Sequence, residues 1–160
     1  MADEQQAPSA RPGYGGPWLQ MAVFCEHVIE DRTGALTVVR VIDEVTITAI
    51  GPDVPDAMPP TDYQFKLVVA LKSGEAQGRH TLSIDKQGPD GITRPGPRMP
   101  VHFEGGNRGV NVVVPQFVIR LELEGLYWFD VKLDGQLLTR MPLRVMYRPQ
   151  RVQLMGLPAQ

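Results

Sequence analysis

The chain has 160 residues, a formal net charge of −2 and a single cysteine, Cys25. This length suits one domain that buries roughly two thirds of its unfolded surface, and one cysteine excludes an intrachain disulfide. The apolar runs are too short to span a bilayer, the acidic N-terminus is not a secretory signal, and the charge is too mild for a nucleic-acid-binding protein. We therefore expect one soluble, cytoplasmic domain that binds neither nucleic acid nor membrane.

The charge is unevenly distributed along the chain. Residues 1–75 hold eleven acidic and five basic side chains, whereas residues 76–160 hold seven acidic and eleven basic ones. Opposed charge poles could steer an acidic partner or a second copy of the chain. Charges scattered over a solvated surface explain the same counts.

The chain divides into a body and two tails. Residues 1–17 are rich in Pro and Gly and hold almost no aliphatic side chains, which predicts a disordered N-terminal tail. Trp18 is expected to begin the first strand. The β-sandwich domain is predicted over residues 18–148, and residues 149–160 are expected to form a loose C-terminal tail.

From Leu19 onward the sequence alternates as a β-strand does, with Cys25, His27 and Ile29 on one face. A turn at residues 31–34 leads into a long β-branched stretch at 35–50. The polar pair Asp43-Glu44 interrupts this stretch, which predicts a bulge or a crossing between sheets.

The later elements are short and separated by Pro or Gly. Two Pro-rich segments, 51–62 and 87–100, are expected to be irregular. Pro115 predicts an edge position or a bend. Strands are predicted at residues 63–71, 78–85, 101–103 and 110–124, and in a closing hairpin.

The closing hairpin contains Asp134-Gly135, a pair typical of two-residue loops. Such a loop would place apolar and polar faces opposite one another along the whole ladder. We therefore predict a three-residue loop, 133–135, which puts the apolar residues on one face. The other face then brings Trp128 close enough to Arg140 for a cation–π contact.

The Gly-x-Tyr motif at residues 125–127 resembles the tyrosine corner of immunoglobulin-like sandwiches, in which the Tyr hydroxyl bonds to upstream backbone. Further motifs along the chain are Cys25-Glu26-His27-Val28, Val41-Ile42-Asp43-Glu44-Val45 and, after the Gly-x-Tyr hairpin, Pro142-Leu143-Arg144-Val145. In these motifs the chain resembles an uncharacterised family of small bacterial β-sandwich proteins, immunoglobulin-like or C2-like. That resemblance implies no assigned activity.

About eight short strands with turn signals between them, and no helical apolar period, predict the fold class. We expect an all-β, antiparallel two-sheet β-sandwich of about 7–8 strands, immunoglobulin-like in architecture. The order of the strands cannot be derived from the pattern.

Cys25 and His27 are two residues apart on one strand face, a spacing that suits a thiolate–imidazole pair or two metal ligands. A structural zinc site needs about four ligands, and only His80 and His102 could complete it. A small core cysteine beside a partly buried histidine is the commoner arrangement. We therefore predict no metal and no nucleophilic cysteine.

No other pattern predicts chemistry. The acids of the 51–62 loop lack the Asp-x-Asp spacing typical of calcium sites. Glu122 and Glu124 share a strand face, which favours a solvated surface over a catalytic pair. No phosphate loop, dinucleotide fingerprint or nucleophile elbow is present. We predict no cofactor and no enzymatic activity.

Five arginines are the candidate partner-binding residues. Arg140, Arg144 and Arg148 recur at even spacing on the last strand and are expected to form a stripe, whereas Arg94 and Arg98 lie in a Pro-rich segment. Such a stripe can bind an acidic partner. A charged edge that prevents strand addition is the alternative.

The function predicted first is a non-catalytic protein-interaction (adaptor) module with an unidentified protein partner, displaying its Pro-rich loops as preshaped binding edges. The alternative is a structural subunit of a larger bacterial or phage-like assembly, with sheet edges as contacts. The oligomeric state does not follow from the sequence.

Overall fold

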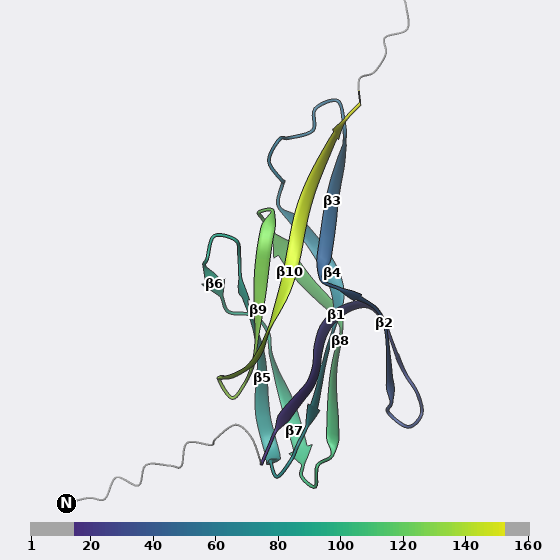
Figure 1. Ribbon diagram of the computed structural model, residues 1–160, viewed down its shortest axis with the longest axis vertical. Helices are drawn as coiled ribbons and strands as arrows, with labels where there is room; N and C mark the ends of the chain where they lie inside the picture. Colours follow the sequence, from purple (N-terminus) through teal and green to yellow (C-terminus); the bar gives the residue numbers. More distant parts are fainter. Residues whose placement is uncertain (1–14, 153–160) are drawn as a thin grey trace, which may run out of the picture.

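The computed structural model describes residues 15–152, and its regular structure there consists of strands alone (Figure 1). The first strand begins at Trp18 as predicted, and the last one continues to Arg151, past the predicted domain end at residue 148. Most of the two predicted tails lies outside the described residues. The ten strands of the described part are β1 (Trp18–Glu30), β2 (Leu36–Ile42), β3 (Glu44–Gly51), β4 (Thr61–Lys72), β5 (Gln77–Gln87), β6 (Thr93–Arg94), β7 (Arg98–Glu104), β8 (Gly109–Leu121), β9 (Gly125–Leu133) and β10 (Gln136–Arg151).

The strands form two sheets. One has the order β2-β1-β4-β8, and the other has the order β3-β10-β9-β5-β6, with β7 also paired to β5. The predicted all-β two-sheet sandwich is therefore confirmed. Two details differ from the prediction, because there are ten strands instead of seven or eight and because β10 runs parallel to β3.

The parallel pair arises where the chain crosses between the sheets. Strand β2 belongs to the four-stranded sheet and β3 to the six-stranded sheet, and a single bend at Asp43 joins them. Of the two alternatives for Asp43-Glu44, a bulge or a crossing, the structure has the crossing. After it, β3 pairs only with β10, from Arg144↔Glu44 to Arg151↔Gly51.

The Pro-rich segments are more ordered than predicted. In the second one, Thr93–Arg94 pairs with the end of β5, and β7 already begins at Arg98, so the expectation of an irregular 87–100 is wrong. Pro100 is tolerated because β7 pairs only with β5 and is an edge strand. Pro115 lies on the edge strand β8 beside a register shift, as predicted.

Aromatic and aliphatic side chains fill the space between the sheets. Phe24 from β1 lies at the centre, with ring centroids 5.0 Å from Phe65, 5.6 Å from Phe117 and 4.9 Å from Phe129, the last edge-on. Alternate residues of β3, β8, β9 and β10 join or pack against this core. Aromatic pairs of this geometry add to the free energy gained by apolar burial.

A second apolar layer lies on the other side of the four-stranded sheet. Leu67 and Val69 point into the core, so Val68 between them points to the outer face, yet its side chain is fully buried. Cys25 is also fully buried outside the core cluster. Something therefore covers this outer face.

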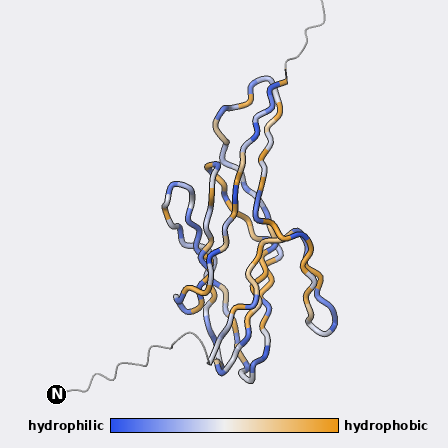
Figure 2. The backbone as a smooth tube through the Cα atoms, in the orientation of Figure 1, coloured by the Kyte–Doolittle hydropathy of each residue, from blue (hydrophilic) through white to orange (hydrophobic). Residues whose placement is uncertain are grey.

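The covering element is the hairpin of residues 26–42, here called the arm. Figure 1 shows the second half of β1 turning back with β2 beside β8, and Figure 2 shows the apolar character of its strands. The Asn111 amide on β8 donates a 3.2 Å hydrogen bond to the Gly34 carbonyl in the arm's turn. The arm therefore forms a third layer against the four-stranded sheet.

The bend that creates the arm lies at Glu26 and Arg40. Arg40 has φ 53°, a left-handed conformation that costs a non-glycine residue about 1 kcal/mol. Its guanidinium pairs with the Glu26 carboxylate at 2.9 Å. Strand pairing continues in the same register on both sides, with Cys25↔Val41 and His27↔Val39, so the bend leaves the alternation of the sequence unchanged.

The closing hairpin turns through two residues, so the predicted three-residue loop is wrong. Leu133 pairs directly with Gln136, and the loop residues Asp134 and Gly135 have φ 49° and 81°, as a type I′ turn requires.

The conflict between the two faces, on which the wrong prediction rested, is resolved inside β10. A register shift between Leu137 and Thr139 inserts one extra residue in β10. Met141 then lies opposite Phe129, and both side chains are buried. The bulge in β10 therefore puts the apolar residues of the hairpin on one face, as the longer loop was expected to do.

The tyrosine corner is confirmed. The Tyr127 hydroxyl donates to the Leu123 carbonyl at 2.8 Å and accepts from the amide N–H groups of Leu123 at 3.0 Å and Glu122 at 3.2 Å. Since Gly125 has φ 132°, the chain between these residues turns in a conformation that glycine adopts readily.

Candidate functional site

Three of the predicted arginines share one face of the protein. Arg140, Arg144 and Arg148 are exposed on β10, alternating with buried side chains that face the core. They lie on the outer face of the six-stranded sheet. The structure therefore places these three side chains on one strand face, as the even spacing predicts.

Arg140 already has partners within this face. Its Nε donates to the Asp130 carboxylate at 2.6 Å, and Nη2 donates to the Gln87 side-chain oxygen at 2.9 Å. Its guanidinium carbon lies 5.2 Å from the centre of the Trp128 ring, which confirms the predicted cation–π contact. Arg140 therefore links side chains of β5 and β9 on the outer face of the sheet.

Arg144 and Arg148 are different, since neither forms an ion pair with any carboxylate of residues 15–152. They border a shallow hollow of about 400 Å³ where β9 begins beside β10. The Glu124 carboxylate lies in the same hollow and accepts a 3.3 Å hydrogen bond from the Tyr147 amide. The negative charge of Glu124 partly offsets the positive charges of Arg144 and Arg148.

Arg94 and Arg98 do not join the stripe. Arg94 lies on β6 and forms a 2.9 Å ion pair with Asp90. Arg98 begins β7 and lies near Asp85, whose pKa is lowered chiefly by the Lys132 ammonium at 2.8 Å, with a smaller effect of Arg98. The five predicted arginines therefore occupy separate places, and no single anion site contains them all.

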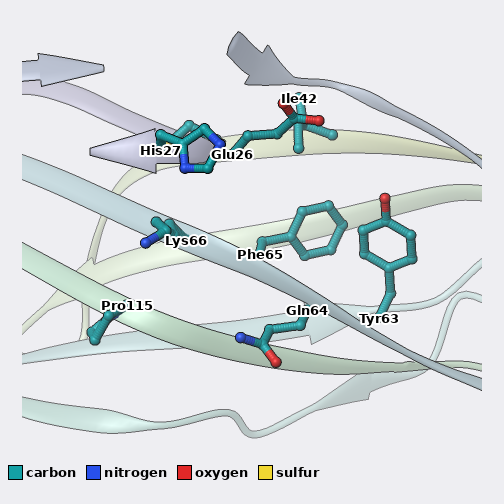
Figure 3. Close-up of a pocket in the computed structure, with 9 residues that line it drawn as sticks. Glu26, His27, Ile42, Tyr63, Gln64, Phe65, Lys66 and Pro115 are labelled. Atoms are coloured by element: carbon teal, nitrogen blue, oxygen red, sulfur yellow. The ribbon is translucent and has the colours of Figure 1, made fainter. Parts of the chain in front are cut away.

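Cys25 and His27 border a pocket of about 390 Å³ at the bend of β1 (Figure 3). Burial raises the pKa of the Cys25 thiol, against a smaller lowering effect of Lys66. A thiol with a raised pKa carries little thiolate at neutral pH, and the thiolate is the nucleophile. The pocket therefore offers a protonated, buried thiol beside an exposed imidazole.

The other two histidines lie far from Cys25 in the fold. His80 on β5 donates from Nδ1 to Asp134 at 2.6 Å, and its Nε2 lies 3.1 Å from the Gln77 carbonyl. His102 is exposed on β7. Among residues 15–152, no group of three or more His, Cys, Asp or Glu side chains gathers where a metal ion could bind.

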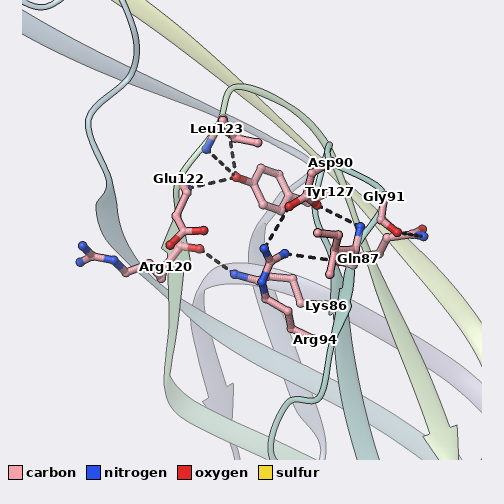
Figure 4. A network of polar contacts seen from close by, with 10 residues as sticks. Lys86, Gln87, Asp90, Gly91, Arg94, Arg120, Glu122, Leu123 and Tyr127 are labelled. Atoms are coloured by element: carbon pink, nitrogen blue, oxygen red, sulfur yellow. Dashed lines mark hydrogen bonds and ion pairs between the residues drawn. The ribbon is translucent and has the colours of Figure 1, made fainter.

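The sequence analysis missed a slot between the two sheets, where β8 faces β5 and the 95–97 segment. It has a volume of about 280 Å³, and Lys86 is among the residues that line it. Figure 4 shows the polar contacts of Lys86. The one local signal was the Pro95-Gly96-Pro97 run, which was expected only to break regular structure.

The sequence analysis also missed the outer face of the arm. Ile29, Val39 and Val41 are 59%, 40% and 56% exposed there. Ile29 pairs with Thr37 and His27 with Val39, so Ile29 and Val39 lie diagonally across the two strands on one face, and Val41 lies beyond the bend at Arg40. The β-branched run of residues 36–42 was the available signal, but alternation alone does not show which face stays open to solvent.

The comparisons with known proteins give a family and no activity. The chain belongs to a family of unknown function (DUF6941), whose model matches residues 20–146. Among solved structures it is similar to the crystal structure of an immunoglobulin-like protein from Pseudomonas aeruginosa, at 18% identity and a TM-score of 0.33, with 81% of this chain and 96% of that chain covered. No curated protein matches the chain. The part of the chain described by the structure holds no helix long and apolar enough to cross a membrane.

Proposed function

We propose that this member of a family of unknown function is a non-catalytic protein-interaction module whose partner binds the outer face of the arm. The observation that carries the proposal is the exposure of three β-branched side chains of the arm, Ile29, Val39 and Val41. Single exposed apolar residues are ordinary, but several on one short hairpin are typical of an interaction surface.

The arm presents this patch in a fixed position. Its turn is bonded to Asn111 of β8, and the Arg40–Glu26 ion pair spans its bend. A surface that is already ordered loses little conformational entropy when a partner binds. The arm therefore supplies a preorganised docking face.

The first Pro-rich loop packs against the core in this proposal and is not the binding surface. In the loop at residues 52–60, Val54 and Met58 are buried in the core, and the Tyr147 hydroxyl donates to the Pro55 carbonyl at 2.8 Å. These contacts hold the loop against the core of the sandwich. The arm is the better candidate for the binding edge because its apolar side chains remain open.

A partner protein is proposed in preference to a nucleic acid or a membrane, because the exposed arm residues are apolar and the arginines are largely balanced by acids. The raised pKa of the Cys25 thiol and the hydrogen bond that pairs His80 with Asp134 support a role without catalysis. We place this role in the cytoplasm, where a single unpaired cysteine is stable.

The test is site-specific photo-cross-linking in the source cells. A photo-reactive amino acid replaces Thr37, which pairs with Ile29 on the exposed arm face, or in the control replaces Val118, which is 59% exposed on β8. We expect one adduct of defined mass from position 37, absent from position 118 and suppressed by Val39→Lys. An adduct that persists in the Val39→Lys protein, or no adduct at all, contradicts the proposal.

A second candidate function is a structural subunit of a larger assembly. The observation that favours it is the edge position of β2, since within residues 15–152 β2 pairs only with β1, and it carries a β-branched run. An unpaired strand edge is a template for pairing with another chain. Light scattering over a range of concentrations should then show discrete oligomers, and Val39→Lys should dissociate them into monomers. If the protein is strictly monomeric at high concentration, this candidate function is rejected.

A further inference from the structure

We propose that the slot between β8 and the 95–97 segment binds a small carboxylate with an apolar body, whose carboxylate group pairs with Lys86. This ligand site is separate from the arm and does not depend on the protein-binding role. The lining of the slot, its rigidity and the ammonium group of Lys86 support this assignment.

The slot is lined mainly by apolar residues, with the basic side chains of Lys86, Arg94 and Arg120 as its charged lining. Phe117 and Ile119 from β8 form one side, Ile84 and Phe129 form the floor, and the Pro95 and Pro97 rings contribute the other side. The volume of about 280 Å³ is close to the lower limit of small-molecule sites. The walls therefore suit the apolar part of a small ligand.

The 95–97 segment is held firmly against β5. The Ile84 amide donates to the Pro97 carbonyl at 3.2 Å, and the Gly96 amide donates to the Asp85 carboxylate at 3.3 Å. Gly96 approaches so closely that an added Cβ would lie 1.7 Å from the Ile84 carbonyl oxygen. The wall is thus formed before any ligand arrives, which reduces the entropy lost on binding.

Lys86 supplies the polar end of the slot. Its Nζ donates one hydrogen bond, to the Arg120 carbonyl at 2.7 Å, and lies 5.9 Å from the centre of the Tyr127 ring (Figure 4). An ammonium group has three donors, and no carboxylate of residues 15–152 forms an ion pair with this one. Burial lowers the pKa of Lys86, which reflects the cost of keeping this charge away from water.

The charges around Lys86 leave room for one more anion. Arg94 is already paired with Asp90 at 2.9 Å, and Arg120 is paired with Asp62 at 3.2 Å. The remaining neighbour is Glu122, an exposed acid that raises the pKa of Lys86 without forming an ion pair with it. A ligand carboxylate would provide the missing counter-charge directly, and Glu122 would weaken its binding by repulsion.

The chemistry of the slot selects among ligand classes. A cation is repelled by Lys86, and a neutral apolar molecule leaves the ammonium without a counter-charge. A bare inorganic anion gains nothing from the apolar side chains that line the slot. An apolar body that carries one carboxylate satisfies both ends of the slot.

The test uses the full chain labelled with ¹⁵N and titrated with decanoate, with 1-decanol and inorganic phosphate as comparison probes. We expect decanoate to shift the amide signals of Ile84, Gly96 and Ile119, and to bind at least tenfold more tightly than either comparison probe. No saturable decanoate shifts, shifts located elsewhere, or equal binding of 1-decanol or phosphate would overturn the proposal.

Two variants and one control examine the role of the ammonium. Lys86→Met is expected to weaken decanoate binding at least tenfold, and Glu122→Gln to strengthen it about threefold. Lys72→Met, which removes a lysine on β4 away from the slot, should leave the affinity unchanged. If Lys86→Met does not fold, Glu122→Gln decides, because an unchanged affinity in that variant also overturns the assignment.

Discussion

Replacing Tyr127 by Phe removes one hydroxyl group from the corner that leads from β8 into β9. The ring itself is buried at 3% exposure and keeps its apolar contacts in the Phe variant. Three hydrogen bonds disappear together, the donation to the Leu123 carbonyl and the acceptances from the Leu123 and Glu122 amides. The substitution therefore isolates the polar part of the tyrosine corner.

The expected change in the free energy of unfolding depends on the backbone groups that lose their hydrogen-bond partner. A typical intramolecular hydrogen bond contributes about 1 kcal/mol net, and a buried group left without a partner costs about 1–3 kcal/mol. The corner is only partly buried, so water replaces some of the lost bonds. We expect Tyr127→Phe to lower the free energy of unfolding by about 2 kcal/mol, which for a domain of this size corresponds to a Tm lower by about 4–8 °C.

Urea unfolding followed by tryptophan fluorescence measures this change, with the slope of free energy against urea expected to stay constant. Tyr63→Phe is the matched control. The Tyr63 ring packs 4.6 Å from Phe65, and its hydroxyl makes no hydrogen bond within residues 15–152, so its removal should change stability by less than about 0.5 kcal/mol. If the two variants lose the same free energy, the corner does not stabilise the fold as argued.

Three further predictions follow from other contacts. The Asp134 hydrogen bond raises the pKa of His80 above its ordinary value, so its stabilising effect is complete below pH 6.5 and is lost as the pH rises through the folded-state pKa. Unfolding of wild type from pH 6 to 9 should show this loss, and a loss of the same size in Asp134→Asn, which keeps the turn geometry, would contradict it. Gly96→Ala should lower the free energy of unfolding by more than about 2 kcal/mol, because its Cβ would meet a carbonyl oxygen of β5 at 1.7 Å, and thermal unfolding measures this. Val68→Ala should cost about 1–2 kcal/mol and the exposed Val118→Ala under about 0.5, and equal losses would mean that the arm does not cover the outer face.

The fold class followed from the sequence because local signals carried it. Period-2 alternation, Pro and Gly between strands, and the Gly-x-Tyr motif act over a few residues, and all three describe the observed structure. The register of the closing hairpin did not follow, because the bulge between Leu137 and Thr139 leaves no mark in residue type. Its effect is visible only when the buried faces of both strands are known.

The candidate sites were predicted less well, and for a physical reason. Even spacing correctly put Arg140, Arg144 and Arg148 on one face. It could not show that Arg140 already donates hydrogen bonds to Asp130 and Gln87. The arm depends on a bend at Arg40 that preserves alternation. The slot depends on where two sheets separate, which is a property of tertiary packing.

The pairing of β3 with β10 constrains how the protein is made. The register joins Glu44 to Arg144 and Gly51 to Arg151, segments about one hundred residues apart in the chain. On a translating ribosome, β3 therefore waits without a neighbour while the whole remainder of the domain is synthesised. Contacts between such distant segments form slowly, since a large loop must close first. The six-stranded sheet is completed only after β10 leaves the exit tunnel, so a nascent chain exposes the β3 edge to chaperones and to other nascent chains for most of its synthesis.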